Sequence, residues 1–320
     1  MLYISCVNKK LAVILTKDIQ MKKLTAILIF AILTNCKENE SLVKSSISEM
    51  ELLGKVKTVI DIHLELQRDE HTTSIAKIDS IGYTIKTFNK EGFIIDEKIK
   101  IKGLLESQRI YVYNADKRLI EKNYITGGVH YKKDKFFYNK KGFLINENDS
   151  LNLGVVNIDY KYDKKGNIIE KSTNSSTGVK TLELYSYDKK DRILQREYIR
   201  DENNLVSSEY YEYEDDSSKV VKSNFGMDGK KSKSVSYLDS SKRIIKSKAY
   251  ENETLFRFSE YFYYKDGKDS LSYHTDLNKN KKYCLKTTYQ LDNNGNWIKQ
   301  ESYKNDTLIN LKKRMITYYE

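Results

Sequence analysis

Proline is absent from all 320 residues of the chain. A proline removes one backbone donor from the hydrogen-bond ladder of a β-sheet, so strands with a neighbour on both sides exclude it. Outside residues 21–35 no stretch keeps the 3.6-residue period of an amphipathic helix. The absence of proline therefore favours a sheet made mostly of interior strands, with almost no helix.

Cysteine is scarce, with three residues in the whole chain: Cys6, Cys36 and Cys284. If export removes the residues before Cys36 and a lipid modifies its thiol, Cys284 is left alone. No internal disulfide can then form, and strand pairing and packing must hold the fold.

Residues that carry chemistry are also few. The four histidines, His63, His71, His130 and His274, are scattered and match no metal-binding spacing. No nucleophile-elbow or phosphate-loop motif occurs. Acidic pairs such as Asp215-Asp216 fall in expected turns, where solvated acids are common. The sequence predicts no catalytic residue, no cofactor, no metal site and no enzyme activity.

Long runs of one charge sign are missing as well. The formal net charge is +11, and without residues 1–35 it is 51 − 44 = +7. Acids and bases alternate along the predicted strands, as at Asp159 and Lys161. This pattern indicates a solvated surface instead of a nucleic-acid footprint.

The longest apolar run, Leu24 to Leu33, has ten residues and is too short to span a bilayer. It follows Lys22-Lys23 and precedes Cys36, the order found in a lipoprotein signal peptide. We therefore expect translation to start at Met21, residues 1–20 to be an upstream extension, residues 21–35 to be the signal peptide, and Cys36 to carry lipid. The alternative is a buried element followed by an ordinary cysteine.

Residues 36–49 read as the lipidated cysteine and a polar tether. Within them, 37–40 (KENE) is similar to the tag that sends some lipoproteins to the outer face of the outer membrane, although a plain tether explains it equally well. The predicted location is the cell envelope, lipid-anchored through Cys36, with the outer membrane favoured.

What the chain has in abundance is tyrosine, 26 residues, in a repeated pattern. In residues 158–169 (IDYKYDKKGNII), alternation places Ile158, Tyr160 and Tyr162 on one face of a strand. Asp163 can accept a hydrogen bond from the backbone two residues on, and Gly166 can take positive φ. The segment therefore predicts a hairpin.

The pattern recurs about every 25 residues. The residue before the turn acid is, in order, Phe88, Tyr113, Tyr138, Tyr162, Tyr187, Tyr213, Leu238, Tyr264 and Leu291. A unit of this length holds two strands of about eight or nine residues and two short turns. Residues 50–320 are thus predicted to form one all-β domain, an antiparallel meander of 25-residue hairpin repeats, curled or rolled into a sheet of about 18–20 strands.

Residues 160–171 (YKYDKKGNIIEK) and 185–197 (YSYDKKDRILQRE) resemble the YD repeats of Rhs-type proteins. The resemblance implies a large β-shell, which in the longest family members encloses a C-terminal toxin. This chain ends in a strand-like segment, 314–319, so the resemblance implies a shell protein without a toxin domain.

Tyrosines at two equivalent slots are the one constellation that repeats: Tyr111, Tyr113, Tyr160, Tyr162, Tyr185, Tyr187, Tyr211 and Tyr213. Equivalent strands lie two strand spacings apart, so the rings form a ladder. The ladder is either a buried core or an aromatic groove for a glycan or extended peptide.

The sequence therefore predicts a non-enzymatic, lipid-anchored envelope protein that binds a glycan or protein partner on its curved sheet. The alternative is a structural or accessory protein of an Rhs-like contact-dependent toxin system. Membrane attachment is expected through the lipid, nucleic acid is not expected as a partner, and the oligomeric state is left open.

Overall fold

The computed structural model describes residues 44–68, 75–151, 154–201, 204–214, 219–226, 229 and 231–320. The chain divides into two units, Met1–Ser41 and Leu42–Glu320, and the described structure belongs to the second. The predicted upstream extension, signal peptide and Cys36 lie outside the described residues. In the described part, no helix is long and apolar enough to cross a membrane.

One four-residue helix, α3, precedes a succession of twenty strands. The elements are α3 (Ser46–Glu49), β1 (Val56–Arg68), β2 (Ile75–Phe88), β3 (Ile94–Ile101), β4 (Ser107–Tyr113), β5 (Leu119–Thr126), β6 (Val129–Tyr138), β7 (Leu144–Leu151), β8 (Gly154–Tyr162), β9 (Ile168–Ser175), β10 (Lys180–Tyr187), β11 (Ile193–Arg200), β12 (Asn204–Glu214), β13 (Lys219–Gly226), β14 (Lys231–Leu238), β15 (Ile244–Glu251), β16 (Thr254–Tyr263), β17 (Asp269–Asp276), β18 (Lys281–Leu291), β19 (Trp297–Lys304) and β20 (Thr307–Tyr318).

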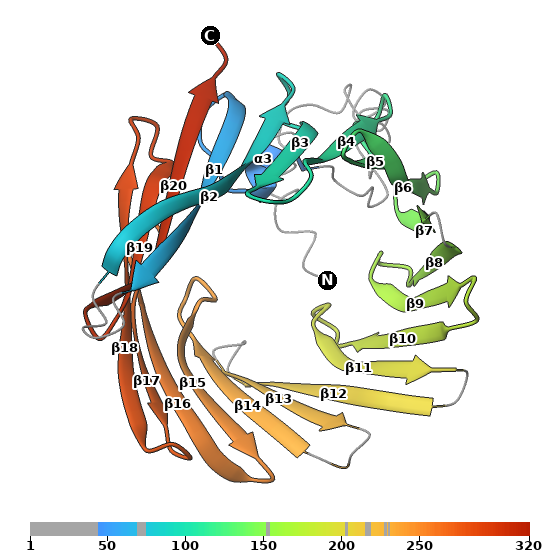
Figure 1. Cartoon of the computed structure of the whole chain (residues 1–320). Helices are drawn as coiled ribbons and strands as arrows, with labels where there is room; N and C mark the ends of the chain where they lie inside the picture. Colours follow the sequence, from blue (N-terminus) through green and yellow to red (C-terminus); the bar gives the residue numbers. More distant parts are fainter. Residues whose placement is uncertain are drawn as a thin grey trace, which may run out of the picture. The chain divides into compact units, whose positions relative to one another are not determined.

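The strands form one antiparallel sheet that closes on itself (Figure 1). Each strand pairs with the next one along the chain, and β1 also pairs with β20, from Val56 opposite Tyr318 to Ile62 opposite Lys313. The all-β meander of 18–20 strands is confirmed at 20 strands. Closure into a barrel, which removes every sheet edge, is the finding beyond that prediction.

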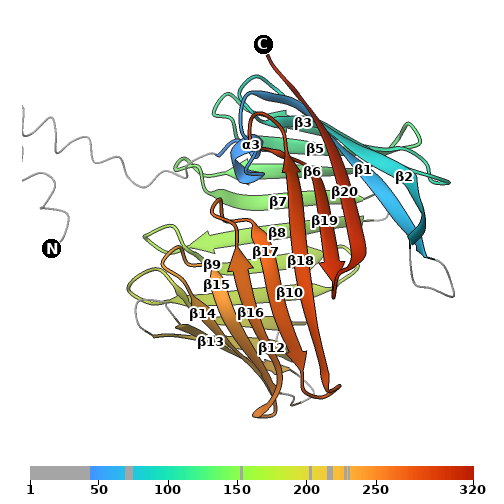
Figure 2. The same cartoon turned by 90° about the vertical axis from the view of Figure 1, so that its left-hand side faces the viewer.

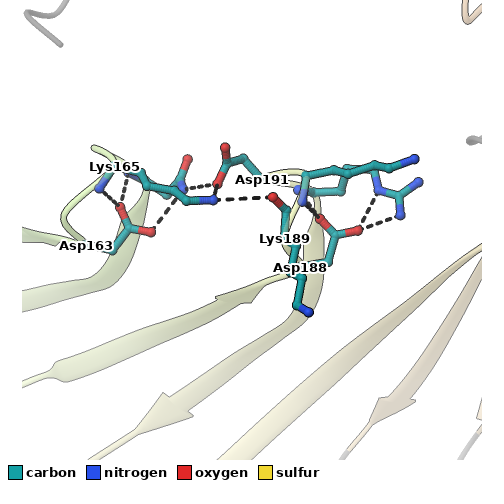
Figure 3. Close-up of polar contacts among 8 residues, drawn as sticks. Asp163, Lys165, Asp188, Lys189 and Asp191 are labelled. Atoms are coloured by element: carbon teal, nitrogen blue, oxygen red, sulfur yellow. Dashed lines mark hydrogen bonds and ion pairs between the residues drawn. The ribbon is translucent and has the colours of Figure 1, made fainter. Parts of the chain in front are cut away.

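The predicted turn chemistry is present at one end of the barrel, which we call the Asx rim. It consists of the turns that follow the even-numbered strands. In the turn after β8, Asp163 Oδ1 accepts hydrogen bonds from the backbone N–H groups of Lys165 (2.8 Å) and Asn167 (2.9 Å). Gly166 takes a φ of +93°. Asp188 repeats these contacts after β10 (Figure 3).

Neighbouring turns of the Asx rim are also joined to each other. Lys165 Nζ lies 2.7 Å from Asp191 Oδ1 in the following turn (Figure 3). At the equivalent positions three units earlier, the charges are reversed, with Glu91 Oε1 3.0 Å from Lys117 Nζ. These contacts link one hairpin to the next beyond the backbone ladder.

One register assignment from the sequence is wrong. In the turn after β16, Tyr264 occupies the position of the turn acid, because its N–H bonds to Lys268 O and its C=O accepts from Gly267. The residue before the turn is therefore Tyr263. Its hydroxyl donates to the backbone carbonyl of Ile244 in the preceding unit, and Tyr162 makes the equivalent bond to Leu144 O. Gly267, at a φ of +89°, is the turn glycine of this unit.

Strand pairing assigns side chains to two faces, because residues directly opposite each other point the same way. One face carries Thr84, Glu97, Asp134 and Ser259, all buried. The other carries exposed residues such as Val112, Phe137, Phe262, Tyr273 and Met315. Side chains converge on the concave side of a closed sheet, so the first face is the inner face and the second is the outer face. Four of the described residues on the outer face are buried: Ser208, Val221, Val235 and Leu311.

The barrel is hollow. Twenty strands at about 4.8 Å spacing give a circumference of about 96 Å and hence a backbone diameter of at least about 30 Å. No side chain spans half of that distance. In the described residues, buried apolar side chains number eight, and they do not fill the centre: Leu52, Val56, Val59, Phe88, Phe93, Val221, Val235 and Leu311. A barrel of this size leaves an aqueous lumen.

The one compact apolar cluster lies where the chain enters the barrel. The cluster consists of Leu52, Val56, Val59 and Phe88. Two more side chains pack against this cluster: Ile47 of α3, and Met50, which directly follows α3. The helix is capped by Ser45, whose side chain accepts from Ser48 N. α3 is thus packed onto the seam region where β1, β2 and β20 meet (Figure 2).

Candidate functional site

A belt of alternating acids and bases follows the inner face from β20 through β1 to β13. We call it the charged belt. It comprises seven acids (Asp61, Glu97, Asp134, Glu147, Asp149, Glu183 and Glu209) and eight bases (Lys86, Arg109, Lys122, Lys132, Lys171, Arg196, Lys222 and Arg314).

At the seam, the belt joins the first and last strands. Arg314 Nε lies 2.6 Å from Asp61 Oδ1, and the guanidinium stacks on Trp297 at 3.8 Å from the ring centroid. Lys86 Nζ is 3.5 Å from Asp61 and 3.7 Å from Glu97. The ion pairs therefore continue from β20 to β1, β2 and β3, across the point where the first and last strands pair.

The belt continues in the same way over the middle strands. Arg196 Nη2 lies 2.6 Å from Glu183 Oε2, and Lys171 Nζ lies 3.4 Å from Glu183 Oε1. Lys222 Nζ lies 2.7 Å from Glu209 Oε1. These contacts lower the pKa of both glutamates, although burial opposes the change.

Two carboxylates meet at one point of the belt. Asp134 and Asp149 are directly opposite each other on β6 and β7. Lys132 Nζ bridges them, at 3.3 Å from Asp134 and 2.6 Å from Asp149. The pKa of Asp149 is raised, first by burial and then by its neighbour Asp134, against the opposing effect of Lys132. At this point of the belt two carboxylates share one lysine.

The structure places all eight ladder tyrosines on the inner face, half-buried among these charges. The first member of each pair donates its hydroxyl hydrogen to a belt glutamate: Tyr111 to Glu97 (3.3 Å), Tyr160 to Glu147 (2.8 Å), Tyr185 to Glu183 (2.6 Å) and Tyr211 to Glu209 (2.8 Å). Burial, together with the acceptor glutamate, raises the pKa of Tyr185 to about 12.

The second member of each pair bonds to the backbone of the preceding unit. Tyr113 donates to Ile94 O, Tyr162 to Leu144 O, Tyr187 to Ile168 O and Tyr213 to Ile193 O, at 2.6–2.9 Å. The last residue of the preceding turn packs on three of these rings: Phe93 on Tyr113, Phe143 on Tyr162 at 5.0 Å, and Arg192 on Tyr213. The rings are therefore fixed parts of the inner wall, with their hydroxyl groups already used.

A smaller polar cluster lies on the inner face of β16 to β18. His274 Nδ1 is 2.8 Å from Ser259 Oγ and its Nε2 is 2.9 Å from Ser272 Oγ, while Tyr283 stacks on the ring at 4.8 Å. Burial lowers the pKa of His274. The ring is thus a neutral link between two serines. In the described residues, no group of three or more His, Cys, Asp or Glu side chains could hold a metal ion.

Two cavities open beside the inner face. One, of about 700 Å³ at the Asx rim, is lined by residues 50–53 and by Asp266, Trp297 and Arg314 among others. The other, of about 400 Å³ at the opposite end, is lined by Glu209, Asn224 and Glu251 among others. Each lining contains charged and polar side chains, so neither cavity is a purely apolar pocket.

Sequence reasoning found the tyrosine ladder but missed the charged belt. The alternation of acids and bases along the strands predicts a solvated face, but it does not say that a charged face lines the inside of a barrel. The signal that could have found the belt is the 25-residue spacing itself. Glu183 and Glu209 lie 26 residues apart, as do Arg196 and Lys222, which fixes them at repeated positions on the tyrosine-bearing face.

No family model and no curated protein matches the chain. Similar solved structures include a porin-like protein from Bacteroides uniformis, with 10% identity and a TM-score of 0.39, covering 82% of this chain and 96% of that one. A porin-like protein from Bacteroides vulgatus has 10% identity and a TM-score of 0.33, over 82% of this chain and 98% of that one. The Tc holotoxin pore of Photorhabdus luminescens has 10% identity and a TM-score of 0.40, over 77% of this chain and 15% of that one.

Two predictions are corrected by these findings. Membership of the YD-repeat family is wrong, since no family model matches. The repeated spacing of tyrosine, Asp or Asn, and glycine indicates β-hairpins with tight turns. Such hairpins occur in any antiparallel meander and do not identify one family. The binding of a glycan or protein partner on the curved sheet, and the alternative role in a toxin system, are also wrong. The sheet closes into a 20-stranded barrel, so its concave face is a lumen.

Proposed function

We propose that the chain is a non-catalytic, hollow β-barrel of the cell envelope that admits small polar solutes into a charge-lined lumen. The observation that carries this proposal is the charged belt on the inner face of a closed sheet. A lumen of this width holds water, and paired charges keep its lining hydrophilic.

The belt also bears on which solutes enter. Seven acids against eight bases leave it close to neutral, and most members are paired within 4 Å. A ring of unpaired charge of one sign would select ions by sign. The belt itself does not, so it is expected to favour neither small cations nor small anions.

The outer face indicates that the barrel stands in water. It carries charged side chains along strands all around the wall: Glu121, Lys133, Asp159, Lys161, Glu170, Glu197, Glu212, Lys233, Lys246, Lys248, Glu260, Lys286, Lys299, Glu301 and Lys313. One Lys or Arg facing lipid at the bilayer midplane costs about 2–4 kcal/mol. A wall with this many charges is stable in water, and attachment to the membrane falls to the proposed lipid on Cys36.

Cysteine labelling tests the lumen. In a Cys284→Ser background, Ser234→Cys places a thiol on the inner face of β14, and Ser223→Cys places a matched thiol on the outer face of β13. Both native serines have intermediate exposure. Small thiol reagents of either charge are expected to label both cysteines at similar rates, whereas a large polymer-linked maleimide labels the outer one far faster. An inner cysteine that resists even the small reagents would refute a water-filled lumen.

A second measurement tests the environment of the wall. The proposal predicts that the purified barrel stays dispersed without detergent and produces no conductance when added to a planar bilayer. Stepwise ion currents of single channels would show that the wall spans lipid and would overturn the assignment of the outer face to water.

Mass spectrometry of the native N-terminus tests the anchor separately, with an unmodified peptide across Cys36 as the contrary result.

A further inference from the structure

The chain enters the barrel at the Asx rim. Ile47 N donates to Gly92 O in the turn after β2 (3.0 Å), and Ser46 Oγ accepts from Ile94 N (3.0 Å). Farther on, Leu53 and Asn296 exchange two hydrogen bonds of 2.8 Å, which hold the entry segment to the turn after β18. Lys44, the first described residue, therefore lies at this rim.

The length of that segment limits how far the rim can stand from a membrane. Seven residues lie between Cys36 and Lys44, the first described residue, and the eight residue-to-residue steps span no more than about 28 Å even when fully extended. If Cys36 carries lipid, which is part of the proposed function, the Asx rim is the end of the barrel held near the bilayer.

The same rim presents a cluster of lysines. Lys140, Lys164 and Lys189 are exposed at the second position of three successive turns, after β6, β8 and β10. The turn acids beside them stay ionised, but the described turns of the Asx rim carry fourteen Lys or Arg against eight Asp or Glu. Asp163 and Asp188 are folded back onto backbone N–H groups, and those hydrogen bonds lower the pKa of both.

The opposite rim has the reverse bias. Among its described turn residues, Glu106, Asp201, Glu253 and Asp306 are acidic, against Lys102 and Lys279. The barrel is therefore polarised along its axis, with the more basic arc at the end from which the tether leaves. Anionic lipid headgroups attract basic side chains held close to the membrane surface.

We propose that the Asx rim docks on the anionic surface of the membrane that holds the tether, through Lys140, Lys164 and Lys189. One mouth of the barrel then faces the bilayer and the acidic rim faces away from it. The proposal rests on the proposed lipid anchor for its geometry, but the attraction of the rim for anionic lipid is independent of that anchor.

The first test uses the chain without residues 1–35 and with Cys36→Ala, so that no lipid contributes. Its partition onto phosphatidylcholine vesicles is measured with and without phosphatidylglycerol. Each lysine at such a surface strengthens binding roughly fivefold, so K140Q/K164Q/K189Q should weaken binding to the anionic vesicles about a hundredfold. The matched control, K102Q/K279Q/K282Q at the opposite rim, should bind as the parent does. An equal effect of the two triple variants, or no preference of the parent for anionic vesicles, overturns the proposal.

The second test uses the mature lipidated protein in vesicles that contain nitroxide-labelled lipid. In a Cys284→Ser background, a fluorophore is attached at Ser241→Cys on the Asx rim or at Asn278→Cys on the opposite rim, both exposed. Quenching at position 241 alone is expected. Quenching at 278, at both positions or at neither contradicts the orientation. Failure of lipidation at Cys36, read by mass spectrometry, is a separate result and leaves the first test intact.

Discussion

At the scale of single residues, the repeat is held by three small devices. An Asx side chain closes most of the described turns at the Asx rim, and a residue with positive φ completes each of these turns. In most units a tyrosine hydroxyl also bonds to the backbone of the unit before. Where glycine is missing, Lys117, Asp191 and Lys242 take φ values of +61° to +64° in its place. The turn geometry therefore survives loss of the glycine, at the cost of local backbone strain.

Tyr162 tests the ladder. Its hydroxyl donates to Leu144 O at 2.6 Å and its ring packs on Phe143. Tyr162→Phe should lower the free energy of unfolding by about 1 kcal/mol, the value of one neutral hydrogen bond. Tyr162→Ala should lower it by about 2–4 kcal/mol, because it also removes a half-buried ring. Urea unfolding measures both.

Gly166→Val is the companion variant, since it forces a β-branched residue to a φ of +93° with its Cβ only 2.7 Å from the Phe143 ring. It should destabilise through the turn. A Tyr162→Ala protein as stable as the parent, beside a destabilised Gly166→Val protein, would show that the ladder tyrosines are not part of the wall.

The turn acids predict a loss of stability in acid. The largest cause that lowers the pKa of Asp163 and Asp188 is the hydrogen bonds that their carboxylates accept from backbone N–H groups. The pKa of Asp239 is lowered in the same way, by the backbone N–H groups of Arg243 and Ser241. A carboxyl group with a lowered pKa in the folded state stabilises it above its ordinary pKa of about 4. That contribution disappears as the pH falls through the folded-state value.

Thermal melting between neutral pH and pH 2 measures this loss. The variant D163N/D188N/D239N keeps the accepting oxygen but cannot titrate, as at the native Asn89 and Asn139 turns. Its melting temperature should fall less steeply in acid than that of the parent. Identical acid profiles would show that these turns do not contribute to acid sensitivity.

At the scale of elements, the sequence predicts the hairpins well because their signals are local. Alternation, the Asx residue and the glycine all act within ten residues, so strand and turn positions follow from the printed chain. The assignment failed at Tyr264, where a tyrosine replaces the acid and the register moves by one residue. α3 was also missed, since a four-residue helix has no period to detect and is stabilised by tertiary contacts.

Asn296 tests how the entry segment is held. Its side chain is 4% exposed and bonds to both N–H and C=O of Leu53. Asn296→Ala leaves two backbone groups without these partners and should cost about 2–3 kcal/mol. Hydrogen exchange of residues 46–53 should accelerate more than that of the mid-barrel strands. Asn293→Ala, exposed in the same turn, is the control. Equal protection of residues 46–53 in the two variants would contradict a clasp by Asn296.

At the scale of the whole molecule, the sequence predicts the number of strands but not their closure. Whether β1 meets β20 depends on the twist and stagger accumulated over nineteen strand pairs, and no single turn encodes it. The contacts at the seam, such as Arg314 with Asp61, join residues 253 positions apart. For the same reason, the charged belt could not be recognised as a lumen before the sheet was seen to close.

Formation of a disulfide across the seam tests closure most directly. Thr58 and Thr317 are directly opposite each other on β1 and β20, and their hydroxyl groups are hydrogen-bonded. In a Cys284→Ser background, Thr58→Cys/Thr317→Cys should oxidise within one chain and give a monomer of altered mobility on a non-reducing gel. The control pair Thr58→Cys/Thr288→Cys, with the second thiol on β18, should stay reduced. A Thr58→Cys/Thr317→Cys protein that remains reduced, or that links only between chains, would show that β1 and β20 are free edges and that the barrel is open.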